Sequence, residues 1–189
     1  MRKLISFMHT SLDGFVAGTK GEMDWINVDD EIFDYAGHNT NDADTGLYGR
    51  VTYDMMESYW PTAGDQPNAS KHDKEHSQWY NNVEKIVLSK SLAGKNIPKT
   101  QIVSSNIKEE ILKHKNKNGK NIIMFGSPSA SHTLLQLGLI DEYWLFVNPV
   151  LLGAGIPLFK NINEPVKLNL IKTKVFKCGV TGMHFEISK

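Results

Sequence analysis

Residues 121–159 constrain the fold more than any other part of the chain. They open with an apolar run at 122–125 that has no polar residue for an exposed face, and such a short run is typical of a buried strand. Ser127 follows as the N-cap of a helix, and Gly138 is placed to end that helix. A second apolar run occupies residues 143–152. The order strand, helix, strand predicts a parallel pair joined by a right-handed crossover.

Strand and helix patterns alternate along the rest of the chain. They predict strands at 4–10, 15–18, 45–48, 85–88 and 102–103. They predict one helix that begins near Asp29 and two more at 51–59 and 107–114. Two final strands, at 166–176 and 180–187, are expected to form a C-terminal hairpin. Trp60-Pro61 is expected to end the second helix, residues 62–77 to form a polar loop, and residues 113–120 to form a solvated turn. The pattern predicts one α/β domain over residues 1–189, with a central mixed, mainly parallel sheet, flanking helices and an antiparallel C-terminal hairpin.

The charge balance and the cysteine count exclude several classes of protein. The chain has 189 residues, of which 21 are basic and 21 acidic, so it lacks the excess basic field of a nucleic-acid-binding protein. No apolar run approaches the length of a membrane span, and residues 1–10 are too short for a signal peptide. Cys178 is the only cysteine, which rules out an internal disulfide and favours a reducing compartment. We therefore expect a cytoplasmic protein with no nucleic-acid or membrane partner.

Two of the expected helices begin directly after a glycine at the tip of a strand, one after Gly49 and one after Gly126. Free backbone N–H groups at the positive end of a helix dipole bind phosphate. Arg50 adds a planar fork suited to phosphate, and Ser89 and Lys90 add a hydroxyl and a charge at another strand end. Together these residues favour NADPH as the ligand, because NADPH carries a pyrophosphate and a 2′-phosphate. ATP is less favoured, because the chain has no Walker lysine.

Three other motifs are weaker. His72 and His76 fit the H-x-x-E-H zinc pattern, but no third ligand stands out, so an exposed charged segment is favoured and no metal site is predicted. Residues 153–155 (Gly-Ala-Gly) lack the third glycine of a dinucleotide fingerprint. Pro128 stands two residues after Gly126, where a serine-hydrolase elbow needs its serine.

Four segments resemble one known family. They are Ser11-Leu12-Asp13-Gly14, Gly49-Arg50-Val51-Thr52-Tyr53, Trp60-Pro61, and the segment from Asp141-Glu142 through the run NPVLLGAGIPLF at 148–159. On these segments the chain resembles the dihydrofolate reductase-like family, and more closely the RibD C-terminal domain, the reductase part of the riboflavin-biosynthesis deaminase-reductase, in its stand-alone form. The resemblance covers nearly the whole chain. It implies a dihydrofolate reductase-like fold, NADPH as hydride donor and a homodimer.

The resemblance also implies positions in the cofactor site. Val16 and Ala17 match positions beside the nicotinamide. The segment that binds the pyrophosphate and the 2′-phosphate is matched by Gly49, Arg50 and Thr52, and the strand end at the adenosine phosphate by Ser89 and Lys90. The second glycine-rich turn is matched by Gly126, Ser127 and Ser129. The chain departs from the family at Ser127, because the family has a second glycine there. A serine still presents its N–H group but restricts close approach.

The expected reaction is hydride transfer from NADPH to a small heterocyclic or carbonyl-bearing substrate. The substrate pocket is expected to be formed by His9, Trp25, Phe33, Tyr53 and Glu57. His9 and Glu57 are the candidate proton donors. The sequence is compatible with three functions: a reductase like 5-amino-6-(5-phosphoribosylamino)uracil reductase, a reductase of another small molecule such as dihydrofolate, and a nucleotide-binding protein without turnover.

Overall fold

The computed structural model describes residues 1–188. Its strands are β1 (Leu4–Thr10), β2 (Phe15–Ala17), β3 (Ala43–Gly49), β4 (Glu84–Leu88), β5 (Thr100–Val103), β6 (Asn121–Phe125), β7 (Glu142–Val147), β8 (Ile156–Pro157), β9 (Leu168–Val175) and β10 (Thr181–Ile187). Its helices are α1 (Asp30–Thr40), α2 (Arg50–Ala63), α3 (Lys71–Asn82), α4 (Ile107–Asn116) and α5 (Pro128–Gln136). No helix within residues 1–188 is long and apolar enough to cross a bilayer.

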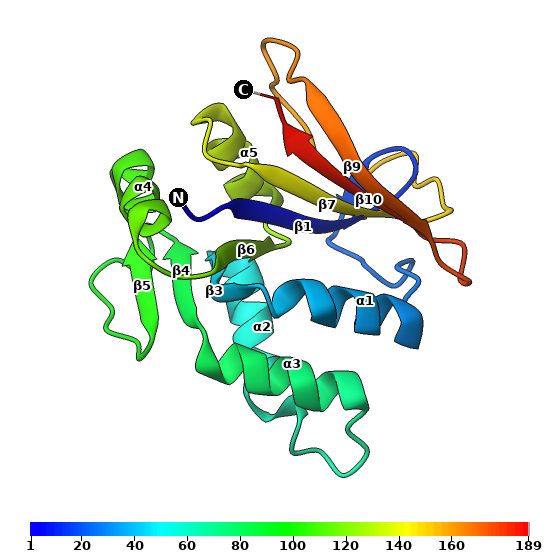
Figure 1. Ribbon diagram of the computed structural model, residues 1–189, viewed down its shortest axis with the longest axis horizontal. Helices are drawn as coiled ribbons and strands as arrows, with labels where there is room; N and C mark the ends of the chain where they lie inside the picture. Colours follow the sequence, from blue (N-terminus) through cyan, green and yellow to red (C-terminus); the bar gives the residue numbers. More distant parts are fainter. Residues whose placement is uncertain (189) are drawn as a thin grey trace.

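The main sheet has the strand order β5-β4-β3-β6-β1-β7-β10-β9, with helices on both faces (Figure 1). Neighbouring strands are parallel from β5 to β7, and β10 and β9 continue the sheet antiparallel. The predicted α/β sheet with an antiparallel C-terminal hairpin is therefore confirmed. The crossover from β6 to β7 differs in one respect from the expected pair, because β1 lies between these two parallel strands. A separate small sheet pairs β2 with β8.

Side chains alternate along β1 and so contribute to a core on each face of the sheet. Leu4 and Met8 belong to the core that α4 and α5 cover, whereas Ile5 and Phe7 belong to the core that α1, α2 and α3 cover. His9 continues the second set and therefore lies on the α1 face. This position brings its ring onto Phe146 of β7, with 5.0 Å between the ring centroids.

Two helix predictions on this second face are wrong. Helix α2 continues through Trp60 and Pro61 to Ala63. Pro61 lies in the last turn, so it removes one hydrogen bond, to the carbonyl four residues earlier, and α2 ends two residues after it.

Residues 71–82 form α3 and not a polar loop. A capping box starts this helix: the Ser70 hydroxyl accepts from the N–H of Asp73 at 3.1 Å, and the Asp73 carboxylate accepts from the N–H of Ser70 at 2.9 Å. His76 is buried on the face that α3 turns to the sheet, whereas Lys74 and Glu75 are exposed, so the prediction of an exposed charged segment holds only in part. Within residues 1–188 no three metal-ligating side chains come together.

The basic run at 113–120 is only partly a solvated turn, because Lys115 is buried at the end of α4. Its ammonium lies 2.5 Å from the Asp141 carboxylate and donates to the Leu139 carbonyl at 2.8 Å. The fold thus compensates the buried charge with an ion pair and a hydrogen bond.

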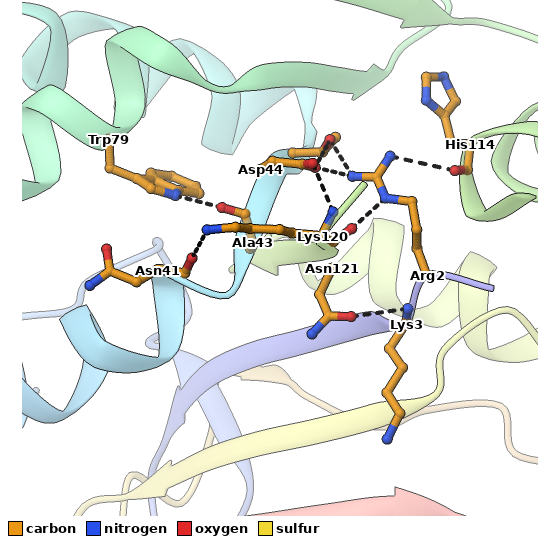
Figure 2. Close-up of polar contacts among 10 residues, drawn as sticks. Arg2, Lys3, Asn41, Ala43, Asp44, Trp79, His114, Lys120 and Asn121 are labelled. Atoms are coloured by element: carbon orange, nitrogen blue, oxygen red, sulfur yellow. Dashed lines mark hydrogen bonds and ion pairs between the residues drawn. The ribbon is translucent and has the colours of Figure 1, made fainter. Parts of the chain in front are cut away.

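Arg2 holds the amino edge of the parallel strands together. Its guanidinium pairs with the Asp44 carboxylate and donates to the main-chain carbonyls of His114 and Lys120 (Figure 2). The N–H of Lys120 donates to the same Asp44 carboxylate at 2.8 Å (Figure 2). These contacts join Arg2, two residues before β1, to the starts of β3 and β6. Polar contacts close this end of the sheet, and the carboxyl ends of the strands form the opposite edge, where ligands bind in sheets of this kind.

Candidate functional site

A cavity of about 760 Å³ lies at the carboxyl ends of β3, β4, β5 and β6, where α2 and α5 begin. We call it the carboxyl-edge pocket, and its volume is that of a site for a large organic ligand. The predicted cofactor residues that line it are Gly49, Arg50, Thr52, Ser89, Lys90, Ser127 and Ser129. The sheet thus brings together residues from four separate parts of the sequence.

The two predicted glycine turns are joined by a hydrogen bond. The N–H of Gly49 donates to the Ser127 hydroxyl at 2.7 Å, and a Cβ on Gly49 would come 3.1 Å from that oxygen. Gly126 and Ser127 both have positive φ, at 56° and 61°. Ser127 occupies the N-cap position of α5, but its hydroxyl makes no capping bond there, so its predicted capping role is wrong. Its hydroxyl instead holds the starts of α2 and α5 side by side at one pocket.

The side chains around the carboxyl-edge pocket give it a positive charge. Arg50, Lys90 and Lys160 line it, and no aspartate or glutamate does so among the residues described. The Arg50 guanidinium is held by Asp54 one turn along α2, at 2.7 Å, and both side chains are exposed. An exposed pair of this kind is weak, so Arg50 is available to an anion. Sequence reasoning missed Lys160, because nothing in its local pattern marks it.

His132 of α5 is a second residue of this pocket that the sequence did not reveal. Its Nε2 lies 2.8 Å from the Leu158 carbonyl. Since a carbonyl only accepts, Nε2 carries the proton and Nδ1 is left as an acceptor. Nδ1 is buried without a protein partner. The pocket therefore holds one unpaired hydrogen-bond acceptor among its hydroxyls and cations.

Val16 and Ala17 do not line the carboxyl-edge pocket. Both are buried in β2, which pairs with β8, and Ile156 of β8 does line the pocket. Gly155 makes this pairing possible, because a Cβ there would lie 2.3 Å from the Ala17 carbonyl oxygen. The nicotinamide role of Val16 and Ala17 stays a prediction.

A second, smaller cavity of about 140 Å³ lies between α1 and the sheet. We call it the aromatic pocket. Its lining includes Phe7 and His9 of β1, Phe33 of α1, Trp60 of α2, His76 of α3 and Phe125 of β6. Aspartate, glutamate, lysine and arginine are all missing from its lining within the described chain. The Phe33 ring stacks on His72, with 4.0 Å between centroids and 13° between planes.

The expected grouping of the substrate residues is wrong in part, because the aromatic pocket contains only His9 and Phe33 of that set. The Glu57 carboxylate accepts from the Tyr80 hydroxyl at 2.7 Å and lines neither pocket. Tyr53 is buried in the core. The Trp25 indole donates to the carbonyl of Glu22 in the loop after β2. Helical periodicity alone did not show which face of α2 turns toward the pocket.

Burial keeps the two histidines of the aromatic pocket neutral. It lowers the pKa of His9 to about 4. It lowers the pKa of His76 to about 3, and the nearby His72 contributes to the same direction. Nδ1 of His9 and Nε2 of His76 are both buried with no protein partner. At neutral pH the pocket therefore presents uncharged imidazoles.

The walls of the two pockets come close to each other in the sequence at the end of β6. Phe125 lines the aromatic pocket, Ser127 lines the carboxyl-edge pocket, and Gly126 stands between them without a side chain. A Cβ at Gly126 would lie 3.4 Å from the Thr52 methyl group. The described linings share no residue, so the segment 125–127 is where the chain passes from the wall of one pocket to the wall of the other.

Solved structures identify the fold. The chain superimposes on a putative riboflavin biosynthesis protein from Shewanella sp. PV-4 with a TM-score of 0.71 and 26% identity, over 99% of each chain. It superimposes on the dihydrofolate reductase of Enterococcus faecalis, complexed with NADP(H) and RAB-propyl, with a TM-score of 0.64 and 16% identity, over 99% of this chain and 97% of that one. The protein has a dihydrofolate reductase-like fold, as the sequence predicts.

Sequence similarity shows the family. The RibD C-terminal domain family matches residues 2–181. The uncharacterized protein YyaP of Bacillus subtilis (strain 168) is 34% identical over 188 residues, which cover 98% of this chain and 95% of that protein. The chain therefore belongs to the RibD C-terminal domain family, and its fold is that of riboflavin-biosynthesis-type reductases. The predicted resemblance is confirmed.

Proposed function

We propose that the protein is an NADPH-dependent reductase that transfers hydride to a small heterocyclic or carbonyl-bearing substrate, in the manner of 5-amino-6-(5-phosphoribosylamino)uracil reductase. One observation carries this proposal. The chain has a cation-lined pocket without carboxylates and an uncharged aromatic pocket, and their linings include Ser127 and Phe125, one on each side of Gly126 in the sequence. The first suits a polyanionic dinucleotide and the second a flat substrate. The family and the NADP(H) complex of the Enterococcus faecalis enzyme support the same assignment.

The carboxyl-edge pocket fits the cofactor in its charge and in its backbone. The N–H groups at the starts of α2 and α5 suit a pyrophosphate, and Arg50 or Lys90 suits the additional 2′-phosphate. His132 Nδ1 offers an acceptor to a ribose hydroxyl or to the carboxamide NH₂. NADPH, when bound, supplies the hydride, and the chain supplies orientation. Gly126 leaves room for close approach between the two pockets.

His9 is the polar group of the aromatic pocket nearest in sequence to the expected nicotinamide positions. Because burial lowers its pKa to about 4, the imidazolium form is scarce at neutral pH. Its role is therefore to form a hydrogen bond to the substrate and to align it, and a proton needed by the product comes from water through this ring. The proposed proton-donor role of Glu57 has less support, since Tyr80 already binds its carboxylate.

A dihydrofolate reductase-type activity is the alternative substrate assignment. A protonated pterin is stabilised by a buried carboxylate, and the described lining of the aromatic pocket contains none. The pocket therefore favours a substrate that stays uncharged. A nucleotide-binding protein without turnover is the remaining alternative.

The test is a titration with NADPH and with NADH, followed by quenching of tryptophan fluorescence. We expect saturable quenching and tighter binding of NADPH. Binding of neither cofactor would overturn the reductase assignment. Binding without oxidation of NADPH in any substrate screen would favour the non-catalytic alternative.

We also propose a homodimer in the cytoplasm. Strand β9 is the outer strand of the sheet beside β10, and its Leu170, Ile171 and Val175 are exposed. An edge strand with exposed apolar side chains is a surface that a second copy can cover. The free thiol of Cys178 agrees with a reducing compartment. Sedimentation equilibrium tests the dimer: a monomer that persists at high protein concentration would contradict it.

A further inference from the structure

Two buried nitrogens in the aromatic pocket have no hydrogen-bond partner. They are Nδ1 of His9 and Nε2 of His76, and both residues line the cavity. Leaving a buried polar atom unpaired costs free energy, so such an atom in a folded protein calls for an explanation. A ligand that hydrogen-bonds both nitrogens supplies one. His9 comes from β1 and His76 from α3, so the two groups approach the ligand from different sides.

The size and walls of the aromatic pocket define the shape of that ligand. Its volume is about 140 Å³. In another protein, an engineered apolar cavity of about 150 Å³ holds benzene. The rings of Phe7 and Phe125 lie 5.3 Å apart on one side, and the stacked pair of Phe33 and His72 lies on the other. The pocket therefore fits one planar ring.

The charge of the pocket defines the charge of the ring. The described lining has no carboxylate and no lysine or arginine. Burial also disfavours the charged form of His9 and His76. A charged ring would enter this pocket without a counter-ion, at a large cost in hydration. An uncharged ring with polar edge atoms meets the two imidazoles without this cost.

A polar cleft extends the aromatic pocket between α1 and α3, which run side by side below the sheet (Figure 1). The two cavities share Gly37, Thr40, His72 and His76. The cleft has a volume of about 660 Å³. The cleft is therefore the neighbouring space for a substituent on the ring, with His72 and His76 at the boundary between the two cavities.

The charges in the cleft disfavour a phosphate on that substituent. Lys71 is the one lysine or arginine in its described lining, and its ammonium is already 2.8 Å from the Asp34 carboxylate. Glu75 also lines the cleft. A phosphate would compete with Asp34 for Lys71 and be repelled by both carboxylates. A hydroxyl-bearing substituent meets donors and acceptors without this repulsion.

We propose that the aromatic pocket binds a single uncharged heteroaromatic ring through His9 Nδ1 and His76 Nε2, with an unphosphorylated polar substituent in the cleft between α1 and α3. This inference rests on the proposed function, because it names the substrate class of the same site. It distinguishes this protein, whose substrate would carry no phosphate, from a reductase whose substrate carries one.

Uridine and uridine 5′-phosphate are a matched pair of probes, since they differ only in the phosphate. Calorimetric titration of the full chain with each probe measures affinity without turnover. We expect uridine to bind at least tenfold more tightly than its phosphate. His76→Leu should weaken uridine binding at least fivefold, and His76→Gln, which keeps an acceptor, should restore part of it. His114→Leu, on α4 outside both cavities, is the control and should leave uridine binding unchanged.

Two results would overturn the proposal. The first is binding of the phosphate as tightly as uridine, or no binding of uridine. The second is uridine affinity that is unchanged in both His76→Leu and His9→Leu, with thermal melting showing that each variant is folded. The NADPH titration on the same preparations reports the proposed function separately, because the cofactor binds in the carboxyl-edge pocket.

Discussion

The carboxyl-edge pocket and the aromatic pocket have lining residues on either side of Gly126 in the sequence, but they are built by different means. The first is made largely by backbone turns at strand ends, with exposed cations and hydroxyls around them. The second is made by side chains from β1, β6, α1, α2 and α3, and the buried polar atoms without a protein partner in its described lining are imidazole nitrogens. A polyanion needs the first kind of surface and an uncharged ring the second. The contrast suggests a division of labour, in which one pocket holds a charged cofactor and the other a neutral substrate.

The largest expected effect concerns the buried histidines of the aromatic pocket. Burial lowers the pKa of His9 to about 4 and that of His76 to about 3, whereas both take a proton near pH 6.5 in the unfolded chain. Stability is therefore fully present above pH 6.5 and is lost as the pH falls toward 4. The loss at pH 4 is about 3 kcal/mol for each histidine. Urea denaturation at pH 7 and pH 4 measures it.

The variant His76→Phe tests the origin of this loss. It removes one of the two titrating rings, so the difference in unfolding free energy between pH 7 and pH 4 should shrink by about 3 kcal/mol. An unchanged difference would show that His76 is not kept neutral by burial, and the contrast between the two pockets would weaken.

The next largest effect is expected at the turn between the pockets. Gly126→Val places a β-branched side chain at a φ of 56° and against Thr52, at the point where the cofactor must approach closely. We expect NADPH affinity to fall about 100-fold, or about 2.7 kcal/mol. Gly138→Val is the matched control, because it imposes similar strain at a φ of 67° at the other end of α5, with open space around its Cβ. Equal losses in both variants would mean that strain alone is responsible.

A smaller effect is expected for the charge of the carboxyl-edge pocket. Arg50→Ala should weaken NADPH about tenfold and NADH less, because only NADPH carries the 2′-phosphate. Asp54→Ala is the control, since it frees Arg50 from its partner and should leave NADPH binding unchanged or tighter. The same loss for both cofactors in Arg50→Ala would remove Arg50 from the 2′-phosphate site.

The smallest effect is expected for Glu57. Glu57→Gln keeps an acceptor for the Tyr80 hydroxyl and changes neither pocket, so kcat/KM for a substrate found by screening should change less than about twofold. His9→Gln in the same assay should have a much larger effect. A large loss for Glu57→Gln would restore it as a candidate proton donor and would contradict the division between the pockets.

The two pockets also differ in how far they can be predicted from sequence. Gly49 and Gly126 mark strand tips that open helices, and this local pattern, together with the family resemblance, named residues that the structure places around one pocket. The aromatic pocket depends on which residues of separate helices face one another. His76 illustrates the difficulty, because its polar surroundings in the sequence suggest exposure, yet the capping box at Ser70 starts a helix that buries it.

The sheet itself was predictable for a similar reason. The apolar runs at 4–10 and 122–125 mark buried strands by their own composition, and the terminal hairpin is marked by its turn. The position of β1 between β6 and β7 could not be predicted in this way, because it depends on pairing between strands far apart in the sequence. The prediction that the second helix ends at Trp60-Pro61 is wrong because proline usually ends a helix, whereas Pro61 lies inside the last turn of α2.

The most direct test of the two-pocket arrangement is a crystal structure of the protein with NADPH. The decisive observation is the position of the nicotinamide C4 atom. The arrangement predicts the pyrophosphate between the starts of α2 and α5, and the nicotinamide at Gly126 with C4 toward Phe125 and the aromatic pocket. A cofactor bound elsewhere, or a nicotinamide turned away from that pocket, would contradict hydride transfer between the two sites.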